Sequence, residues 1–133
     1  MGRGLVGVVA GLIAWVIFAT VANLALRMLV PGYAGAEPAM NFTMAMMIGR
    51  LLVGAVSSVV AGSIAAGIAK GTGWVPAMVG VFLIAMFIPV HVGLWDKFPV
   101  WYHLAFLVSL LPLALLGAKL VASRRAIEGA RQG

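Results

Sequence analysis

The sequence contains no cysteine and only three acidic residues in 133 positions. Without a thiol, the chain has no disulfide, no cysteine nucleophile, no iron–sulfur cluster and no cysteine-ligated zinc site. Charged residues of both signs make up only 9% of the chain, whereas about a quarter is usual in a soluble domain. So little charge does not provide the polar surface that a water-soluble fold requires.

Apolar residues take the place of charge, because 64% of the chain is hydrophobic. A helix needs about 20 apolar residues to cross the hydrocarbon core of a bilayer, and four segments reach that length. We therefore predict an all-α integral membrane protein that forms a single transmembrane domain over residues 1–133. Its predicted parts are spans over about 4–26, 45–69, 74–95 and 100–121, and a basic, frayed tail over 123–133.

The connections between these segments predict how the spans pack. Residues 70–73 and 96–99 are short, turn-forming links, and links this short place consecutive helices side by side and antiparallel. We therefore expect an up-down-up-down four-helix bundle. Counting about 20 residues back from Lys70 places the membrane boundary of the second helix at residue 50, and we expect residues 40–49 to extend this helix at or above the outer surface. This places Arg50 at the outer membrane boundary, where its side chain reaches water.

The distribution of basic residues predicts the orientation. Nine basic and three acidic residues give a net charge of +6, and an excess of Lys and Arg marks the cytoplasmic side of a membrane protein. We predict that both termini are cytoplasmic (N-in/C-in), because this puts six basic residues inside and three outside. The inner set is Arg3, Lys70, Lys119, Arg124, Arg125 and Arg131, and the outer set is Arg27, Arg50 and Lys97.

The same features point to a location and to partners. A chain rich in Gly, Ala and Val with four spans resembles many small bacterial inner-membrane proteins, and this resemblance implies the bacterial inner (plasma) membrane. The lipid bilayer is the expected partner. No patch of basic residues interleaved with aromatic ones occurs, so we predict no nucleic-acid binding.

Small residues at four-residue spacing predict helix contacts, because they let backbones approach closely in lipid. We expect the span over 45–69, which carries such rows on two faces, to be central, and Leu83 to face lipid or to pack loosely. A face of this kind also suits a homo-oligomer or a larger membrane complex. The predicted packing residues are Gly7 and Gly11 in the first span and Gly54, Ser58, Gly62 and Ala66 in the second, where Ser63, Gly67 and Gly71 form a further row.

Most of the remaining polar chemistry falls on the predicted outer side. The short link over 96–99 brings His91 and His103 to similar depth, and we expect them to converge with Arg50 into a ligand-binding rim, with Glu37 or Asp96 as the counter-charge. The ligand suited to such a rim is a headgroup, a quinone-like ring or a partner protein. Two histidines without a carboxylate at fixed spacing are not a metal motif, so we predict neither a metal nor a cofactor.

Other readings of the rim remain open. The two imidazoles could hold haem or a metal, and thioethers of the nearby methionines could add a Cu(I) site. Arg50 could meet an anion at the opening of a transport path. Alternatively, each side chain is an ordinary interfacial anchor. The methionines concerned are Met40, Met44, Met46 and Met47.

No pattern indicates catalysis. Ser57 and Ser58 have no base nearby in the sequence, and the glycines around Lys70 lack the spacing of a phosphate-binding loop. We therefore predict no catalytic residue and a non-catalytic role, as an accessory or structural subunit or a self-associating membrane protein. The alternatives are a small transporter or channel subunit, and a membrane redox protein that binds haem, metal or quinone through histidine.

Overall fold

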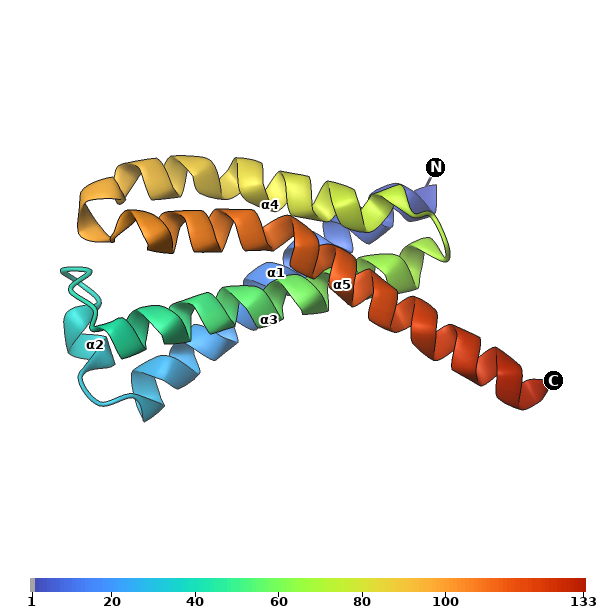
Figure 1. The fold of residues 1–133 in the computed structure, drawn as a ribbon, viewed down its shortest axis with the longest axis horizontal. Coiled ribbons are helices and arrows are strands. Elements are labelled where there is room, and N and C mark those ends of the chain that lie inside the picture. Colours follow the sequence, from blue (N-terminus) through green and yellow to red (C-terminus); the bar gives the residue numbers. More distant parts are fainter. Residues whose placement is uncertain (1) are drawn as a thin grey trace.

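The structure is a computed structural model that describes residues 2–133, and these residues form helices and connecting turns without a strand. Four long helices lie along one another, and successive long helices run in opposite directions (Figure 1). The prediction of an all-α chain with four long apolar helices is therefore confirmed. In order, the elements are α1 (Gly2–Leu29), α2 (Tyr33–Ala36), α3 (Met44–Ala69), α4 (Trp74–Gly93), the 3₁₀ helix η1 (Trp95–Lys97) and α5 (Val100–Gln132).

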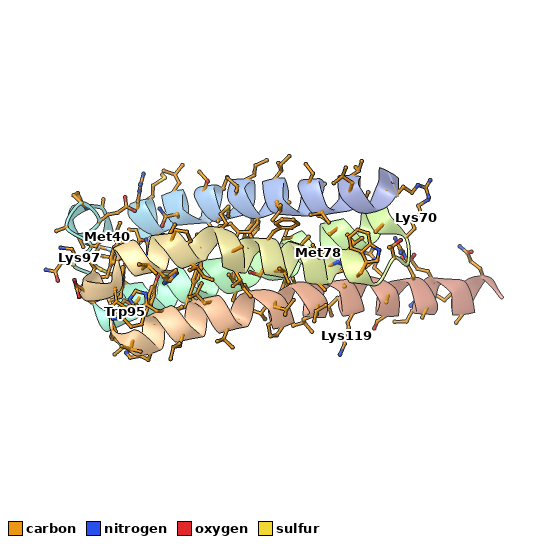
Figure 2. All side chains as sticks on the ribbon, turned by 90° about the horizontal axis from the view of Figure 1, so that it is seen from above. Met40, Lys70, Met78, Trp95, Lys97 and Lys119 are labelled. Carbon is orange, nitrogen blue, oxygen red and sulfur yellow. The ribbon has the colours of Figure 1, made fainter. Side chains whose placement is uncertain are left out.

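The two ends of the bundle differ in what they carry. Both chain termini lie at one end, here called the terminal end, together with the connection from α3 to α4 (Figure 1). The opposite end, here called the distal end, holds α2 and η1. In Figure 2, Met40, Trp95 and Lys97 mark the distal end and Lys70 lies toward the terminal end.

Each long helix is long and apolar enough to cross a membrane. Their outward faces expose large apolar side chains such as Ile17 (59%), Leu52 (59%) and Val108 (67%). Exposing such apolar faces to water on all four helices is unfavourable. Hydrocarbon suits them, because lipid tails are as apolar as these side chains.

Helix α3 packs most extensively against α1 and α5, while α4 packs against α5, α3 and α1. Glycines make these contacts close in the terminal half. A Cβ added to Gly7 or Gly11 would lie 3.0 Å from a backbone carbonyl oxygen of α3. At Gly62 the backbone of Ala114 on α5 already occupies the place of a Cβ.

The small residues of α3 divide between its two neighbours. Gly54 and Gly62 face α5, Ser58 bonds to Trp15 of α1, and Ala66 is half-buried toward the terminal end. In the further row the Ser63 hydroxyl donates to the carbonyl of Gly117 on α5 (3.1 Å). Gly67 meets α5 only through its carbonyl oxygen, which accepts from Arg125, and an added Cβ at Gly67 or Gly71 would have nothing within 4 Å. The α1 contact uses a row that the sequence did not single out, Ala61, Ala65 and Ala69.

The expectation for Leu83 is wrong, because this side chain is fully buried (0% exposed) in the core with Val79 and Trp15. Helix α4 is apolar on every side, so hydropathy alone gives no information about which face meets lipid and which meets protein.

The start of α3 also differs from the expectation. The helix begins at Met44, where the Thr43 side chain accepts a hydrogen bond from the backbone N–H of Met46 (3.3 Å). Met40 has a positive φ of 53°, which ends any continuous helix at that point. The helical extension therefore covers only residues 44–49 of the range 40–49.

The tail is helical rather than frayed, because α5 continues to Gln132 (Figure 1). Arg124 and Glu128 form an ion pair one turn apart, and alanines favour the helix. Arg125 also donates to the carbonyl oxygen of Gly67 (2.9 Å), which fastens the start of the tail to the end of α3.

Candidate functional site

Arg50 lies at the centre of the polar side chains of the distal end. It is in the second turn of α3 and is half-buried. Its Nη1 donates to the hydroxyl of Tyr33 (2.8 Å) and its Nε to the hydroxyl of Tyr102 (3.2 Å). The guanidinium carbon lies 4.8 Å from the centroid of the Phe42 ring, within cation–π range. Within residues 2–133, no carboxylate lies within 4.0 Å of this cation.

Glu37 is linked to Arg50 only through other side chains. It forms an ion pair with Arg27 and accepts a hydrogen bond from Asn23 Nδ2 (3.2 Å). The Tyr33 hydroxyl, which accepts from Arg50, in turn donates to Asn23 Oδ1 (2.8 Å). A continuous hydrogen-bonded chain thus runs from Arg50 through Tyr33 and Asn23 to Glu37.

The same contacts set the protonation of Glu37. Burial alone would raise the pKa of this carboxyl, but the hydrogen bonds from Arg27 and Asn23 and the charges of Arg27 and Arg50 outweigh it and hold the pKa below 4.5. Glu37 is therefore ionised at neutral pH and already has a cationic partner. It is not the direct counter-ion of Arg50.

His91 of α4 and His103 of α5 meet ring to ring, with their Nδ1 atoms 2.7 Å apart. His103 Nε2 lies 3.3 Å from the carbonyl oxygen of Trp95. A carbonyl only accepts, so a His103 ring with a single N–H carries this proton on Nε2 and accepts at Nδ1 from His91. Both nitrogens of His103 are then occupied, and only Nε2 of His91 remains.

Two adjoining cavities of about 160 and 60 Å³ lie beside these groups. The larger is lined by side chains of all four long helices and the smaller lies toward His91. In this distal half, aromatic side chains between the helices keep them further apart than the glycines do in the terminal half. The Trp15 indole is fixed by donating to Ser58 Oγ (3.1 Å). The residues that line both cavities are Arg50, Phe87, Tyr102 and Phe106.

The structure brings some of the predicted site residues together and separates others. His91 contacts His103, and His91 lines the smaller cavity with Arg50. Glu37 joins the same network at its outer edge. Asp96 does not: it lies exposed on η1, and no ion pair involves it in the part of the chain that the structure describes. Of the two acids predicted for the counter-charge, Glu37 is therefore the one that joins the network in the described residues.

The direct partners of Arg50 were not identified from the sequence. The chain has only two tyrosines, and both bond to Arg50. Tyr33 follows the Pro31–Gly32 turn and Tyr102 lies just after Pro99, so both could have been assigned to the distal end. Nothing in the spacing indicates that their hydroxyls converge.

Fold and site together define a helical protein with four segments able to cross a membrane and an aromatic-lined cavity around one arginine. No protein-family model, curated protein or solved structure matches this chain.

Proposed function

We propose that this chain is a non-catalytic membrane protein that binds a small anionic molecule, of the carboxylate class, in the distal cavity. The observation that carries the proposal is Arg50. Its guanidinium lines both cavities but bonds only to two neutral hydroxyls in the described residues. A guanidinium has five N–H donors, so donors remain for a ligand in the cavity.

Energetics support an anion as the ligand. A cation at the centre of a membrane helix costs about 2.5–3.5 kcal/mol on insertion scales, and the half-buried Arg50 near the start of α3 bears a smaller part of that cost. Neutral phenols and the Phe42 ring offset part of that cost. A carboxylate supplies the missing opposite charge and matches the planar fork of the guanidinium. The rings of Trp15, Phe87 and Phe106 suit an apolar or aromatic body attached to it.

Hydroxyl geometry supports binding rather than catalysis. The serines of α3 are the nucleophile candidates inside the bundle, and each donates to a carbonyl of its own helix. The distances are 2.6 Å for Ser57 to Val53, 2.7 Å for Ser58 to Gly54 and 2.8 Å for Ser63 to Val59. No base accepts a proton from these hydroxyls among the described residues.

The close packing of the terminal half supports binding over conduction. A methyl group at Gly7 or Gly11 would press against the α3 backbone, and at Gly62 the α5 backbone leaves no room for one. A ligand in the distal cavity therefore has no open path through the terminal half of the bundle. We infer that the protein holds its ligand as an accessory or carrier subunit.

Charge supports an orientation for this site. The basic residues divide six to three between the terminal and distal ends, as expected for cytoplasmic termini. We propose an N-in/C-in, up-down-up-down bundle in a bacterial inner membrane. The distal cavity then faces the outer leaflet, and its ligand arrives from outside the cell or from that leaflet.

The test is ligand-induced stabilisation of the purified protein in neutral detergent. Benzoate carries a carboxylate on a planar ring, and benzyl alcohol carries the same ring without charge. We expect benzoate, and not benzyl alcohol, to raise the melting temperature and to change the tryptophan fluorescence, since Trp15 lines the cavity.

Arg50→Gln should remove the effect, whereas the exposed distal Lys97→Gln should retain it. No shift with benzoate, or an equal shift in Arg50→Gln, would contradict an anion site at Arg50.

A further inference from the structure

A second hollow lies at the terminal end, on the opposite side of the molecule from Arg50. It is a groove of about 390 Å³ between the end of α3, the start of α4 and the second half of α5. Its floor is apolar and its rim is the turn over residues 71–73. The floor residues include Ala66, Pro76, Leu115, Ala118 and Ala122.

Cations border this groove without an acid among its lining residues. Arg125 and Lys119 both line it. Arg125 is held in place, because its Nη2 donates to the Gly67 carbonyl oxygen (2.9 Å). That bond uses one of its five N–H donors. The nearest acid along α5 is Glu128, which is already paired with Arg124.

The two cations differ in direction. Lys119 projects away from the body of the bundle (Figure 2), so its aliphatic stem lines the groove while its ammonium extends outward. Arg125 is anchored to the end of α3 by its bond to Gly67. Arg125 is therefore the primary cation for a ligand in the groove, and Lys119 is the secondary one.

The neighbouring Trp74 indicates where the groove lies relative to the membrane. Trp74, at the start of α4, is 52% exposed, and exposed tryptophans at helix ends favour the headgroup level of a bilayer. The groove thus has an apolar floor toward the hydrocarbon and a cationic rim at the headgroups. This arrangement complements a molecule with an anionic head and an apolar tail.

We propose that the groove binds one anionic phospholipid, with its phosphate on Arg125 and Lys119 and the start of an acyl chain over Ala118 and Ala122. Basic pockets between membrane helices recognise anionic headgroups in this way. The site is separate from the Arg50 cavity, and this inference does not rest on the proposed function. The site also requires α5 to remain helical beyond the apolar span, because Arg125 lies there.

The experiment uses the purified full-length chain in neutral detergent with added dioleoyl phosphatidylglycerol. Native mass spectrometry should detect a one-to-one adduct, and the melting temperature should rise. Dioleoyl phosphatidylcholine, with the same chains and no net charge, should bind at least about fivefold more weakly, which corresponds to roughly 1 kcal/mol for a basic residue near a charged surface. Glycerol phosphate, which has the head without the chains, should give no shift.

Variants separate this site from general charge. Arg125→Gln should weaken phosphatidylglycerol binding about tenfold, as expected for a charge-assisted hydrogen bond, while Arg131→Gln on the same exposed helix should leave it unchanged. Ala122→Trp should fill the groove and block binding, whereas Leu120→Trp, which does not line the groove, should not. These bulk variants keep the test valid if Arg125→Gln is unstable.

Several results would overturn the proposal. Equal binding of the two lipids would show that the groove does not distinguish an anionic headgroup from a neutral one. An equal loss in Arg131→Gln would show that the basic tail attracts lipid without a specific site. A full shift with glycerol phosphate would identify a soluble anion instead. Arg50→Gln should keep phosphatidylglycerol binding, so failure at one site leaves the other unaffected.

Discussion

The Nδ1 atoms of His91 and His103 face each other at 2.7 Å across the contact between α4 and α5. Each ring provides the hydrogen-bond partner for the Nδ1 atom of the other. Little water is available there, since His91 is 6% and His103 0% exposed. The pair therefore contributes to the packing of the distal end whether or not a ligand is bound.

The histidine pair should behave as a unit. We expect His91→Phe and His103→Phe each to destabilise the protein, because each leaves one buried ring nitrogen without its partner. The double variant should cost less than the sum, with a coupling free energy of about 0.5–2 kcal/mol. Unfolding by SDS in mixed micelles measures all three values. Strict additivity would show that the two rings do not share a hydrogen bond.

Gly62 and Gly67 offer a matched test of close packing, because both lie inside α3 but only Gly62 meets another backbone. Gly62→Ala should destabilise the bundle strongly, since the methyl group would overlap Ala114. Gly67→Ala should be neutral or stabilising by up to about 1 kcal/mol, the helix preference of Ala over Gly. Melting temperatures in one detergent decide it, and similar losses in both variants would contradict the α3–α5 contact.

The two tyrosines around Arg50 should differ in importance. The Tyr33 hydroxyl takes part in two hydrogen bonds, to Arg50 and Asn23, whereas a single bond, from Arg50, reaches the Tyr102 hydroxyl. Tyr33→Phe should therefore lower the free energy of unfolding by about 1–3 kcal/mol, and Tyr102→Phe by less. The reverse order in SDS unfolding would show that the chain through Asn23 contributes little.

Glu37 should make stability depend on pH in the acidic range. Its pKa in the fold is lowered below 4.5, so the ionised carboxylate stabilises the native state above the unfolded value. This contribution should be constant near neutrality and decline as pH falls below 4.5 and through the folded pKa. Comparing melting temperatures of the natural chain and Glu37→Gln from pH 7 to pH 3 tests this. A gap that widened on acidification would have the wrong sign.

The proposed orientation predicts the behaviour of reporter fusions. Fusions after Lys70 and at the carboxyl terminus should report a cytoplasmic location, and fusions near Glu37 or Lys97 an external one. The reason is the six-to-three division of basic residues between the two ends. A cytoplasmic signal at Glu37 would reverse the assignment of the distal cavity.

The sequence could predict the helices and the gathering of polar groups at one end, because both depend on length. Segments of sufficient apolar length form helices in lipid, and the short link over 96–99 brings His91 and His103 to one level. The role of these residues in ligand binding stays a prediction.

Rotation about the helix axis could not be predicted, because α4 is apolar on every side. Leu83 therefore looked the same as a lipid-facing residue, although it is fully buried. The convergence of Tyr33 and Tyr102 on Arg50 could not be predicted for another reason: the three residues lie on α2, α5 and α3, and their spacing in the chain carries no information about where the hydroxyls meet. Polarity alone predicts a frayed tail, whereas its alanines and the Arg125 bond to Gly67 favour the helix that the structure shows.

The glycine contacts between α3 and α5 are reciprocal. Gly62 of α3 receives the backbone of Ala114, and Gly117 of α5 receives the backbone of Val59 and Ser63. These two notches lie on opposite partners, so sliding either helix by a single residue, about 1.5 Å, would drive a side chain into a facing main chain. The two contacts therefore fix the axial register of α3 against α5. Any motion that opens the distal cavity must pivot about this fixed point rather than shift the helices along their axes.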